Sequence, residues 1–135
     1  MSFRDYAPAP ESTAILDLRP SYGLYIDGQW TDGRGGSMTT ISPATEKSIA
    51  EISLADASDI DRAVAAARKS YDTVWSRMSG AERGKYLFRI ARLIQERARE
   101  FAVAETLDNG KPIRETRDID VPLVAAWFFH YAGWA

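Results

Sequence analysis

The stretch "SGAERGKYLFRIARLIQERAREFA", Ser79 to Ala102, has the pattern of an amphipathic helix with a marked start. Ser79, followed three positions later by Glu82, forms a capping box, in which each side chain satisfies a backbone N–H of the other residue. Apolar residues then recur at helical spacing, at Leu87, Ile90, Ala91, Ile94, Ala98 and Phe101. We therefore predict a helix here, a break near residues 97–100, and a continuation through Leu107.

Helical periodicity also continues on both sides of this stretch. Upstream, "DASDIDRAVAAARKSYDTVW" carries Ser58 as the expected N-cap and Asp61 in the first turn. Its apolar face comprises Ile60, Val64, Ala67, Tyr71 and Val74. Downstream, a last helix is expected from about Ile113 to Tyr131. Pro122 interrupts this helix and predicts either a kink or a new start, because proline has no N–H and its ring collides with the preceding turn.

The first part of the chain has β patterns. "YGLYIDGQW" alternates in polarity and predicts one strand from about residues 23 to 30, and "MTTISP" predicts a second that ends at Pro43. With the turn-rich loop "TDGRGGS" between them, the two are expected to pair as a β-hairpin. "KSIAEISLA" predicts a third strand, although Ile49 has one parity while Ile52 and Leu54 have the other.

Composition sets the limits of this chain. Its 135 residues are enough for one small domain, and its net charge of -2, with scattered Lys and Arg, argues against a nucleic-acid partner. The absence of cysteine excludes disulfides, thiolate metal sites and thiol nucleophiles within these residues. Residues 1–21, which include "APAP", are expected to form an extended arm before a domain of residues 22–135. Arg4 and Asp5 break any apolar leader, and no apolar run could span a membrane, so the cytoplasm is expected.

The motif "LDNGKP" has a structural explanation for most of its residues. Asn109 and Gly110 tolerate left-handed backbone and can end a helix near Leu107, and Pro112 can begin the next helix. Lys111 lies just past that C-terminus, where positive charge is favourable. Asp108 opposes the helix dipole at this position, which hints that its carboxylate has a partner, either a cation or a backbone N–H.

Three further candidates have structural interpretations. "DGRGG", residues 32–36, lacks the glycine spacing of a dinucleotide loop and is interpreted as a connecting loop rather than a phosphate cradle. His130 is the only histidine and has aromatic neighbours, so it is interpreted as a packing residue rather than a base or a zinc ligand. Glu105 and Asp108 share a helical face and could do acid–base work if their pKa values were split, but a solvated pair is the simpler interpretation.

Five segments in order resemble the N-terminal part of the NAD(P)-dependent aldehyde dehydrogenase superfamily. They cover about residues 22–135: "YIDGQW", "ISPATEKSIAEI", "DIDRAVAAARKSYDTVWSRMSGAERGKYLFRIARLI", "ETLDNGKP" and "YAGWA". The resemblance implies an α/β fold that forms the leading part of a Rossmann-like nucleotide-binding domain. It implies an N-terminal β-hairpin and a short strand, followed by three or four helices.

The resemblance also implies a function for the complete protein. Family members oxidise aldehydes to carboxylic acids with NAD or NADP, through a thiolate nucleophile and hydride transfer. Their chains are several times longer, and their nucleophile, general base and main nucleotide contacts lie beyond this segment. We therefore assign no catalytic and no cofactor-binding residue here, and we expect the chain alone to be inactive. Its expected partners are the remainder of the enzyme chain and a small-molecule aldehyde, with a homo-oligomer when complete, and neither nucleic acid nor membrane.

Two sites follow from the same resemblance. Several members bind a monovalent cation through backbone carbonyls and the aspartate of "DNG", and the matching positions are Thr40, Ile41 and Asp108. Oxygen ligands suit hard cations. In some members the helix after "DNGKP" lines the aldehyde channel, and the matching positions are Ile119 and Leu123. By spacing alone this helix face, which continues to Trp127, is more typical of a core.

Two alternatives remain open at the level of the sequence. The chain could be a non-catalytic, mostly helical interaction module derived from the same family, or one piece of a split enzyme. As a segment of an enzyme it should expose apolar surface at "LVAAWFFHYAGWA", which would pack on parts outside these residues.

Overall fold

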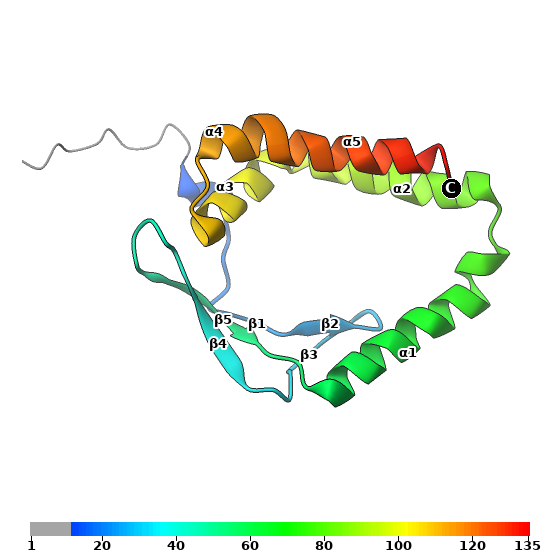
Figure 1. Ribbon diagram of the computed structural model, residues 1–135, viewed down its shortest axis with the longest axis horizontal. Coiled ribbons are helices and arrows are strands. Elements are labelled where there is room, and N and C mark those ends of the chain that lie inside the picture. Colours follow the sequence, from blue (N-terminus) through cyan, green and yellow to red (C-terminus); the bar gives the residue numbers. More distant parts are fainter. Residues whose placement is uncertain (1–11) are drawn as a thin grey trace, which may run out of the picture.

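The computed structural model describes residues 12–135 and arranges them as a strand layer and a helix layer joined by one long helix (Figure 1). The strands are β1 (Ser21–Tyr22), β2 (Leu24–Ile26), β3 (Gln29–Thr31), β4 (Ser37–Ile41) and β5 (Ser48–Ser53). The helices are α1 (Ala57–Thr73), α2 (Gly80–Glu96), α3 (Ala98–Asn109), the single turn α4 (Ile113–Glu115) and α5 (Val121–Ala132), with a π-helical turn at Thr116–Asp120. This order of strands followed by helices confirms the predicted fold class.

The first two-stranded unit is tighter than predicted. β2 and β3 pair antiparallel, with Leu24 opposite Thr31, around a two-residue turn at Asp27 and Gly28. Both turn residues have positive φ, 52° and 78°, as a type I′ turn requires. The single strand predicted for residues 23–30 is therefore wrong, because the Asp-Gly pair folds it back on itself.

The second sheet has the order β1-β5-β4, so the hairpin predicted between the first strand and β4 is also wrong. β4 pairs antiparallel with β5, and β1 pairs with β5 in parallel. The glycine-rich loop explains this choice. Gly35 N–H donates to the Leu54 carbonyl at 2.8 Å, and Leu54 N–H donates to the Gly36 carbonyl at 2.8 Å, which places β4 beside β5.

A β-bulge explains the irregular parity of the third predicted strand. Thr40 faces Ala50 and Ile41 faces Ser48, so Ile49 is an extra residue on β5. A bulge of this kind breaks the alternation of side chains between the two faces of a sheet. Ile49 and Ile52, three positions apart, consequently both line a cavity between this sheet and the helices.

The predicted arm, residues 1–21, is described only from Ser12 onward, and residues 1–11 lie outside the described part. Thr13–Ile15 form a 3-10 turn capped by the Ser12 hydroxyl. Leu18 lines the cavity between the sheet and the helices, and Ser21 is the first residue of β1. The last residues of the predicted arm thus pack on the domain.

Two helix boundaries, the start and the end of α2, lie where they were predicted. α2 begins at the predicted capping box, with Ser79 N–H donating to Glu82 at 2.8 Å, and it ends before Arg97, where the break was predicted. The cap of α1 differs. Asp56, not Ser58, is the N-cap, because its carboxylate accepts the N–H of Asp59 at 2.9 Å and the Asp59 carboxylate accepts the N–H of Asp56 in return.

α2 and α5 run side by side in the helix layer (Figure 1). Small residues let their backbones approach closely: a Cβ on the buried Gly84 would lie 2.7 Å from the Ala132 carbonyl oxygen. Phe88 and Phe129 meet edge to face, with ring centroids 4.8 Å apart, a contact that contributes about 1 kcal/mol beyond its buried area.

The buried core is small. Its apolar members are Ala50, Ala91, Ala102, Val103, Val121 and Ala125. None of the described leucine, isoleucine, methionine or aromatic side chains is fully buried. The predicted exposure of the C-terminal apolar segment is confirmed, with Trp134 78% exposed, and the apolar face of α1 is also open, with Val64 61% exposed. Within residues 12–135, no helix combines the length and apolar character needed to cross a bilayer.

Candidate functional site

A cavity of about 550 Å³ lies between the β1-β5-β4 sheet and helices α2, α3 and α5. Most of its lining is apolar and includes Leu18, Ile49, Ile52, Ile94, Phe101 and Val124. Its polar lining comes from Thr40 on β4 and from Glu105 and Asp108 on α3. The strand layer and the helix layer thus line an open apolar pocket with acidic side chains in its wall.

Two of the three residues that were predicted to bind a cation are in contact at this cavity, through the Thr40 side chain and not through its carbonyl. The Thr40 hydroxyl donates to the Asp108 carboxylate at 2.6 Å, across 68 positions of sequence. The third, Ile41, follows Thr40 on β4, opposite the bulge of β5. β4 forms an edge of its sheet, so its outer backbone groups have no strand partner in the described part of the chain. Asp108 therefore does have a partner, as its position suggested, and that partner is a hydroxyl.

The motif "LDNGKP" holds Asp108 in this place. α3 ends at Asn109, and Gly110 caps it in left-handed backbone, with φ 78°, as predicted. Gly110 also rests on Pro43, since a Cβ here would lie 2.7 Å from the proline Cγ. Lys111 forms an ion pair with Asp120 at the end of the π turn. The motif therefore joins α3 both to the turn after β4 and to the start of α5.

An unsatisfied polar atom lies close to this junction. Ser42 follows Ile41, is 3% exposed, and its hydroxyl oxygen has no hydrogen-bond partner among the described groups. A buried hydroxyl without a protein partner is unusual, and an ordered water or an ion would satisfy it.

The two predicted channel residues lie apart from the cavity. Ile119 is in the π turn and Leu123 is in the first turns of α5, and they are 58% and 50% exposed. Further along α5, Trp127 and Tyr131 stack with ring centroids 5.8 Å apart. We call these four residues the outer row of α5. The row is exposed in this chain, so it is not a core face here.

The remaining candidates from the sequence give no catalytic group. His130 is exposed and packs edge-on against Trp127 and Tyr131, and no cluster of three or more potential metal-ligating His, Cys, Asp or Glu side chains occurs within residues 12–135. Glu105 accepts a long hydrogen bond from the Asn109 amide at 3.4 Å.

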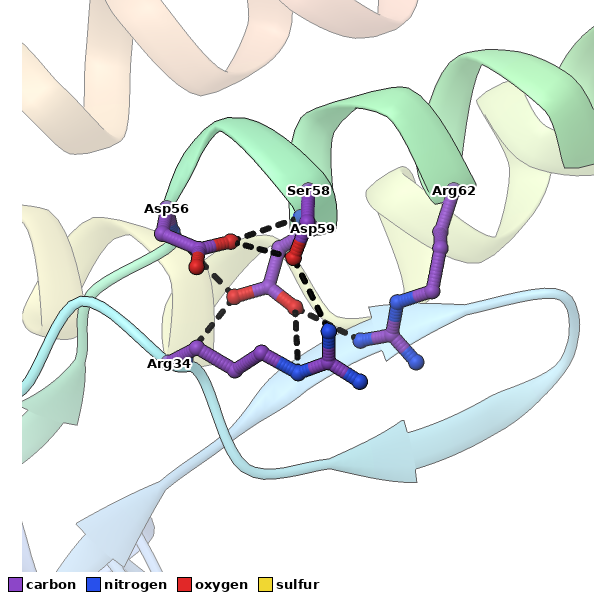
Figure 2. Close-up of polar contacts among 5 residues, drawn as sticks. All are labelled: Arg34, Asp56, Ser58, Asp59 and Arg62. Atoms are coloured by element: carbon purple, nitrogen blue, oxygen red, sulfur yellow. Dashed lines mark hydrogen bonds and ion pairs between the residues drawn. The ribbon is translucent and has the colours of Figure 1, made fainter.

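Sequence reasoning missed a buried carboxylate at the start of α1, shown in Figure 2. Asp59 is fully buried, and it accepts the backbone N–H of Arg34 at 2.8 Å and the guanidinium of Arg62 at 2.7 Å. The Arg34 side chain reaches the Ser58 hydroxyl at 2.9 Å. Asp59 thus fastens the glycine-rich loop to α1. The signal that could have revealed it is the spacing of Asp56 and Asp59, which is that of a capping box.

These contacts also decide the role of "DGRGG". A Cβ on Gly33 would lie 2.2 Å from the Leu54 carbonyl oxygen, so only glycine allows the loop to lie against the end of β5. The N–H groups of Arg34 and Gly35 are used by Asp59 and Leu54. The loop therefore serves to connect β3 and β4, as interpreted, and these two donors are not available to a phosphate.

The hydrogen bond from the Arg34 backbone N–H is the main cause that lowers the pKa of Asp59, from 3.8 to about 2. Burial acts in the opposite direction, while Asp56 N–H and the Arg62 guanidinium lower the pKa further. Near neutral pH the carboxylate is charged and surrounded by donors, which suits a structural clamp and not a general acid or base.

The sequence profile described as the aldehyde dehydrogenase family matches residues 30–135. The chain belongs to the aldehyde dehydrogenase family. It is similar to a putative aldehyde dehydrogenase, DhaS, from Bacillus subtilis, with 43% identity over 119 residues, which are 87% of this chain and 24% of the relative. It is also similar to an acetaldehyde dehydrogenase from Pseudomonas aeruginosa, with 40% identity over 95% of this chain and 25% of the relative.

Solved structures confirm the fold of this aldehyde dehydrogenase segment. The NAD+ complex of aldehyde dehydrogenase from Bacillus cereus overlaps it with a TM-score of 0.83 and 36% identity, over 87% of this chain and 24% of that one. The chain thus spans about a quarter of the length of the relatives it matches. It corresponds to their N-terminal segment.

Asp59→Asn should loosen the glycine-rich loop of this dehydrogenase segment. The amide keeps the shape, but its single oxygen is uncharged, so the hydrogen bonds that the Arg34 and Asp56 N–H groups make to one carboxylate oxygen become weaker, and its NH2 group would face the Arg62 guanidinium. Hydrogen exchange at the Arg34 and Asp56 amides should therefore accelerate at pH 7, and thermal stability should fall by several degrees. Because the folded pKa lies below the ordinary 3.8, the carboxylate stabilises the fold fully above about pH 4, and this contribution is lost as the pH falls toward 2.

The difference between the wild type and Asp59→Asn should accordingly shrink across that acid window. Asp61→Asn, at an exposed position two residues later, is the matched control and should leave both exchange and melting unchanged. Equal loop exchange in the wild type and the Asp59 variant at pH 7 would contradict the clamp.

Proposed function

We propose that the chain is the N-terminal part of an enzyme that oxidises aldehydes to carboxylic acids with NAD or NADP. The observation that carries this proposal is the family match over residues 30–135, supported by the shared fold of a relative solved with NAD+. The nicotinamide would accept the hydride in that enzyme. No cysteine occurs in the 135 residues, so the thiolate nucleophile of this chemistry has to lie elsewhere in the enzyme.

In this proposal the segment acts as a scaffold. Burying one exposed large apolar side chain contributes about 1.5–3 kcal/mol, and both α1 and α5 present several of them. The remainder of the enzyme chain is the partner that we propose for these faces. We further propose a homo-oligomer that is located in the cytoplasm and has a small-molecule aldehyde as substrate; the acetaldehyde dehydrogenase among its relatives supports the substrate class.

The chain alone should show no aldehyde-dependent NADH formation, and it should self-associate through its uncovered apolar faces. Sedimentation velocity and dye binding to apolar surface would measure the association, and NADH absorbance would measure the activity. The continuous enzyme, or the segment mixed with the remainder as a second chain, should oxidise aldehydes. A monodisperse monomer that melts cooperatively would instead support the non-catalytic interaction module.

We also propose a monovalent cation site at Thr40, Ile41 and Asp108. The support is the contact between Thr40 and Asp108, the free edge of β4 and the unsatisfied Ser42 hydroxyl nearby. Backbone carbonyls and a carboxylate are oxygen donors, which suits sodium or potassium. The residues present therefore fit such an ion, which would fix the end of α3 against β4.

Potassium or sodium should raise the melting temperature of the complete enzyme by a few degrees relative to tetramethylammonium at equal ionic strength. Asp108→Asn should abolish this difference, because the site loses its only formal negative charge. Glu105→Gln, one turn earlier on α3 and also in the cavity wall, is the control and should retain it. The site is refuted if Asp108→Asn melts with the same cation dependence as the wild type.

The third proposal is that Ile119 and Leu123 line the path by which the aldehyde reaches the nucleophile. Their exposure on the outer row of α5 supports it, because the side chains are available to a ligand in this segment. Both are aliphatic, so they would favour apolar over hydrated aldehydes.

Leu123→Trp in the complete enzyme should lower kcat/KM for 2-naphthaldehyde about tenfold more than for propanal, since one misfitting apolar group is worth about that factor. Gln95→Trp, on the exposed surface of α2, is the control for added bulk. An unchanged preference between the two aldehydes would remove Leu123 from the channel.

A further inference from the structure

The chain enters α5 through a π-helical turn, and Pro122 explains why. Val121 N–H donates to the Thr116 carbonyl, five residues back, and Pro122 stands in the first turn of α5. In a regular α-helix the proline ring would collide with the carbonyl of Asp118, four residues earlier. A wider turn at this point relieves the collision while the chain remains helical. The new helix start that was one of the two alternatives for Pro122 is thus confirmed, and a π turn that was not predicted precedes it.

The π turn also decides which side chains face inward. Thr116, Val121 and Ala125 are buried, so the buried face advances by five residues and then by four. Regular spacing before Val121 would put Arg117 or Asp118 on that face. These two residues are instead exposed and paired with each other at 2.7 Å. One extra residue in the turn therefore keeps a charged pair out of the helix layer.

A buried hydroxyl anchors this turn. Thr116 is fully buried, and its Oγ1 lies 3.2 Å from the Ala102 carbonyl on α3 and 3.1 Å from the Ile113 carbonyl. The Thr106 hydroxyl lies 3.0 Å from the same oxygen. Thr116 has one proton, which it can donate to one of the two carbonyls or share between them while it accepts a hydrogen bond from Thr106. On the other side, the ion pair between Lys111 and Asp120 holds the end of the turn.

Because the turn adds one residue, it fixes the rotation of the whole of α5. Each residue of an α-helix turns the chain by about 100°, so a change in the turn would swing every outward side chain to a new direction. The outer row begins within the turn, at Ile119, and continues through Leu123 to the stacked pair of Trp127 and Tyr131.

We propose that Thr116 is a positioning residue, which, through the π turn, aims the outer row of α5 and so sets the preference for large apolar aldehydes. This inference rests on the channel proposed above. Thr116 acts through the turn and has no contact with the substrate. The row spans roughly 18 Å along the helix, at 1.5 Å per residue, which suits an extended or aromatic aldehyde better than a short one.

The test compares three isosteric or conservative variants in the complete enzyme. Thr116→Val removes the buried hydroxyl, whereas Thr116→Ser keeps the hydroxyl and removes only the methyl group. Thr106→Val removes the partner hydroxyl and leaves the carbonyl contacts of Thr116 in place. The measurement is the ratio of kcat/KM for 2-naphthaldehyde to that for propanal, with the separate KM and kcat values. Amide exchange at Val121 reports on the π turn itself.

Thr116→Val should lower the ratio about tenfold through a higher KM for 2-naphthaldehyde, with kcat for propanal retained and Val121 exchange accelerated. Thr116→Ser and Thr106→Val should keep the wild-type ratio. A ratio that is unchanged in Thr116→Val, or lowered equally in Thr116→Ser, overturns the proposal, because the effect would then not follow the hydroxyl.

Asp120→Asn covers the case in which Thr116→Val does not fold. This substitution removes the ion pair between Lys111 and Asp120 at the end of the π turn, and Asp120 is partly exposed. The ratio of kcat/KM values should fall, as in Thr116→Val, by a smaller factor. An unchanged ratio there would overturn the proposal. If the wild-type enzyme oxidises neither aldehyde, the proposed function fails by itself. The positioning role then stands or falls on whether Thr116→Val releases the Val121 amide while Thr106→Val does not.

Discussion

The two layers of this chain meet where the end of α3 rests on the end of β4. Two contacts make that junction: the hydrogen bond from Thr40 to Asp108 and the close packing of Gly110 on Pro43. Both join segments nearly seventy residues apart, and they hold the sheet over the helices so that an apolar cavity lies between them. The direction of α4, the π turn and α5 depends on the same place, because these elements leave directly from the "GKP" that ends the motif.

Local signals in the sequence were enough wherever neighbours in the chain satisfy one another. The Ser79 and Glu82 box, the break at Arg97 and the left-handed Gly110 were all predictable, because each depends on groups within a few residues. The Asp27-Gly28 turn was equally local and was overlooked, because the alternation of apolar residues across it resembled one continuous strand.

Other features depended on partners that sequence spacing does not show. The choice of β5 as the partner of β4 follows from the glycine loop lying on Leu54, and the burial of Asp59 follows from a loop twenty-five residues away. At the candidate site, the family resemblance predicts that Asp108 and Thr40 belong together, whereas periodicity alone predicts a core face at Ile119, Leu123 and Trp127. The π turn could not be predicted from the sequence, because it depends on two requirements at once. The Pro122 ring must avoid a carbonyl of the preceding turn, and the charged pair of Arg117 and Asp118 must stay exposed.

The parallel pairing of β1 with β5 has a consequence for the order in which the chain can acquire its structure. Ser21 and Glu51 are thirty positions apart, whereas β2 and β3 close around two residues. Loops of the second kind form within microseconds, while the first must wait until the intervening strands are arranged. During synthesis the hairpin of β2 and β3 would therefore form early. β1 could pair with β5 only after β5 has left the ribosome, so this short parallel pair would be among the last parts of the strand layer to form.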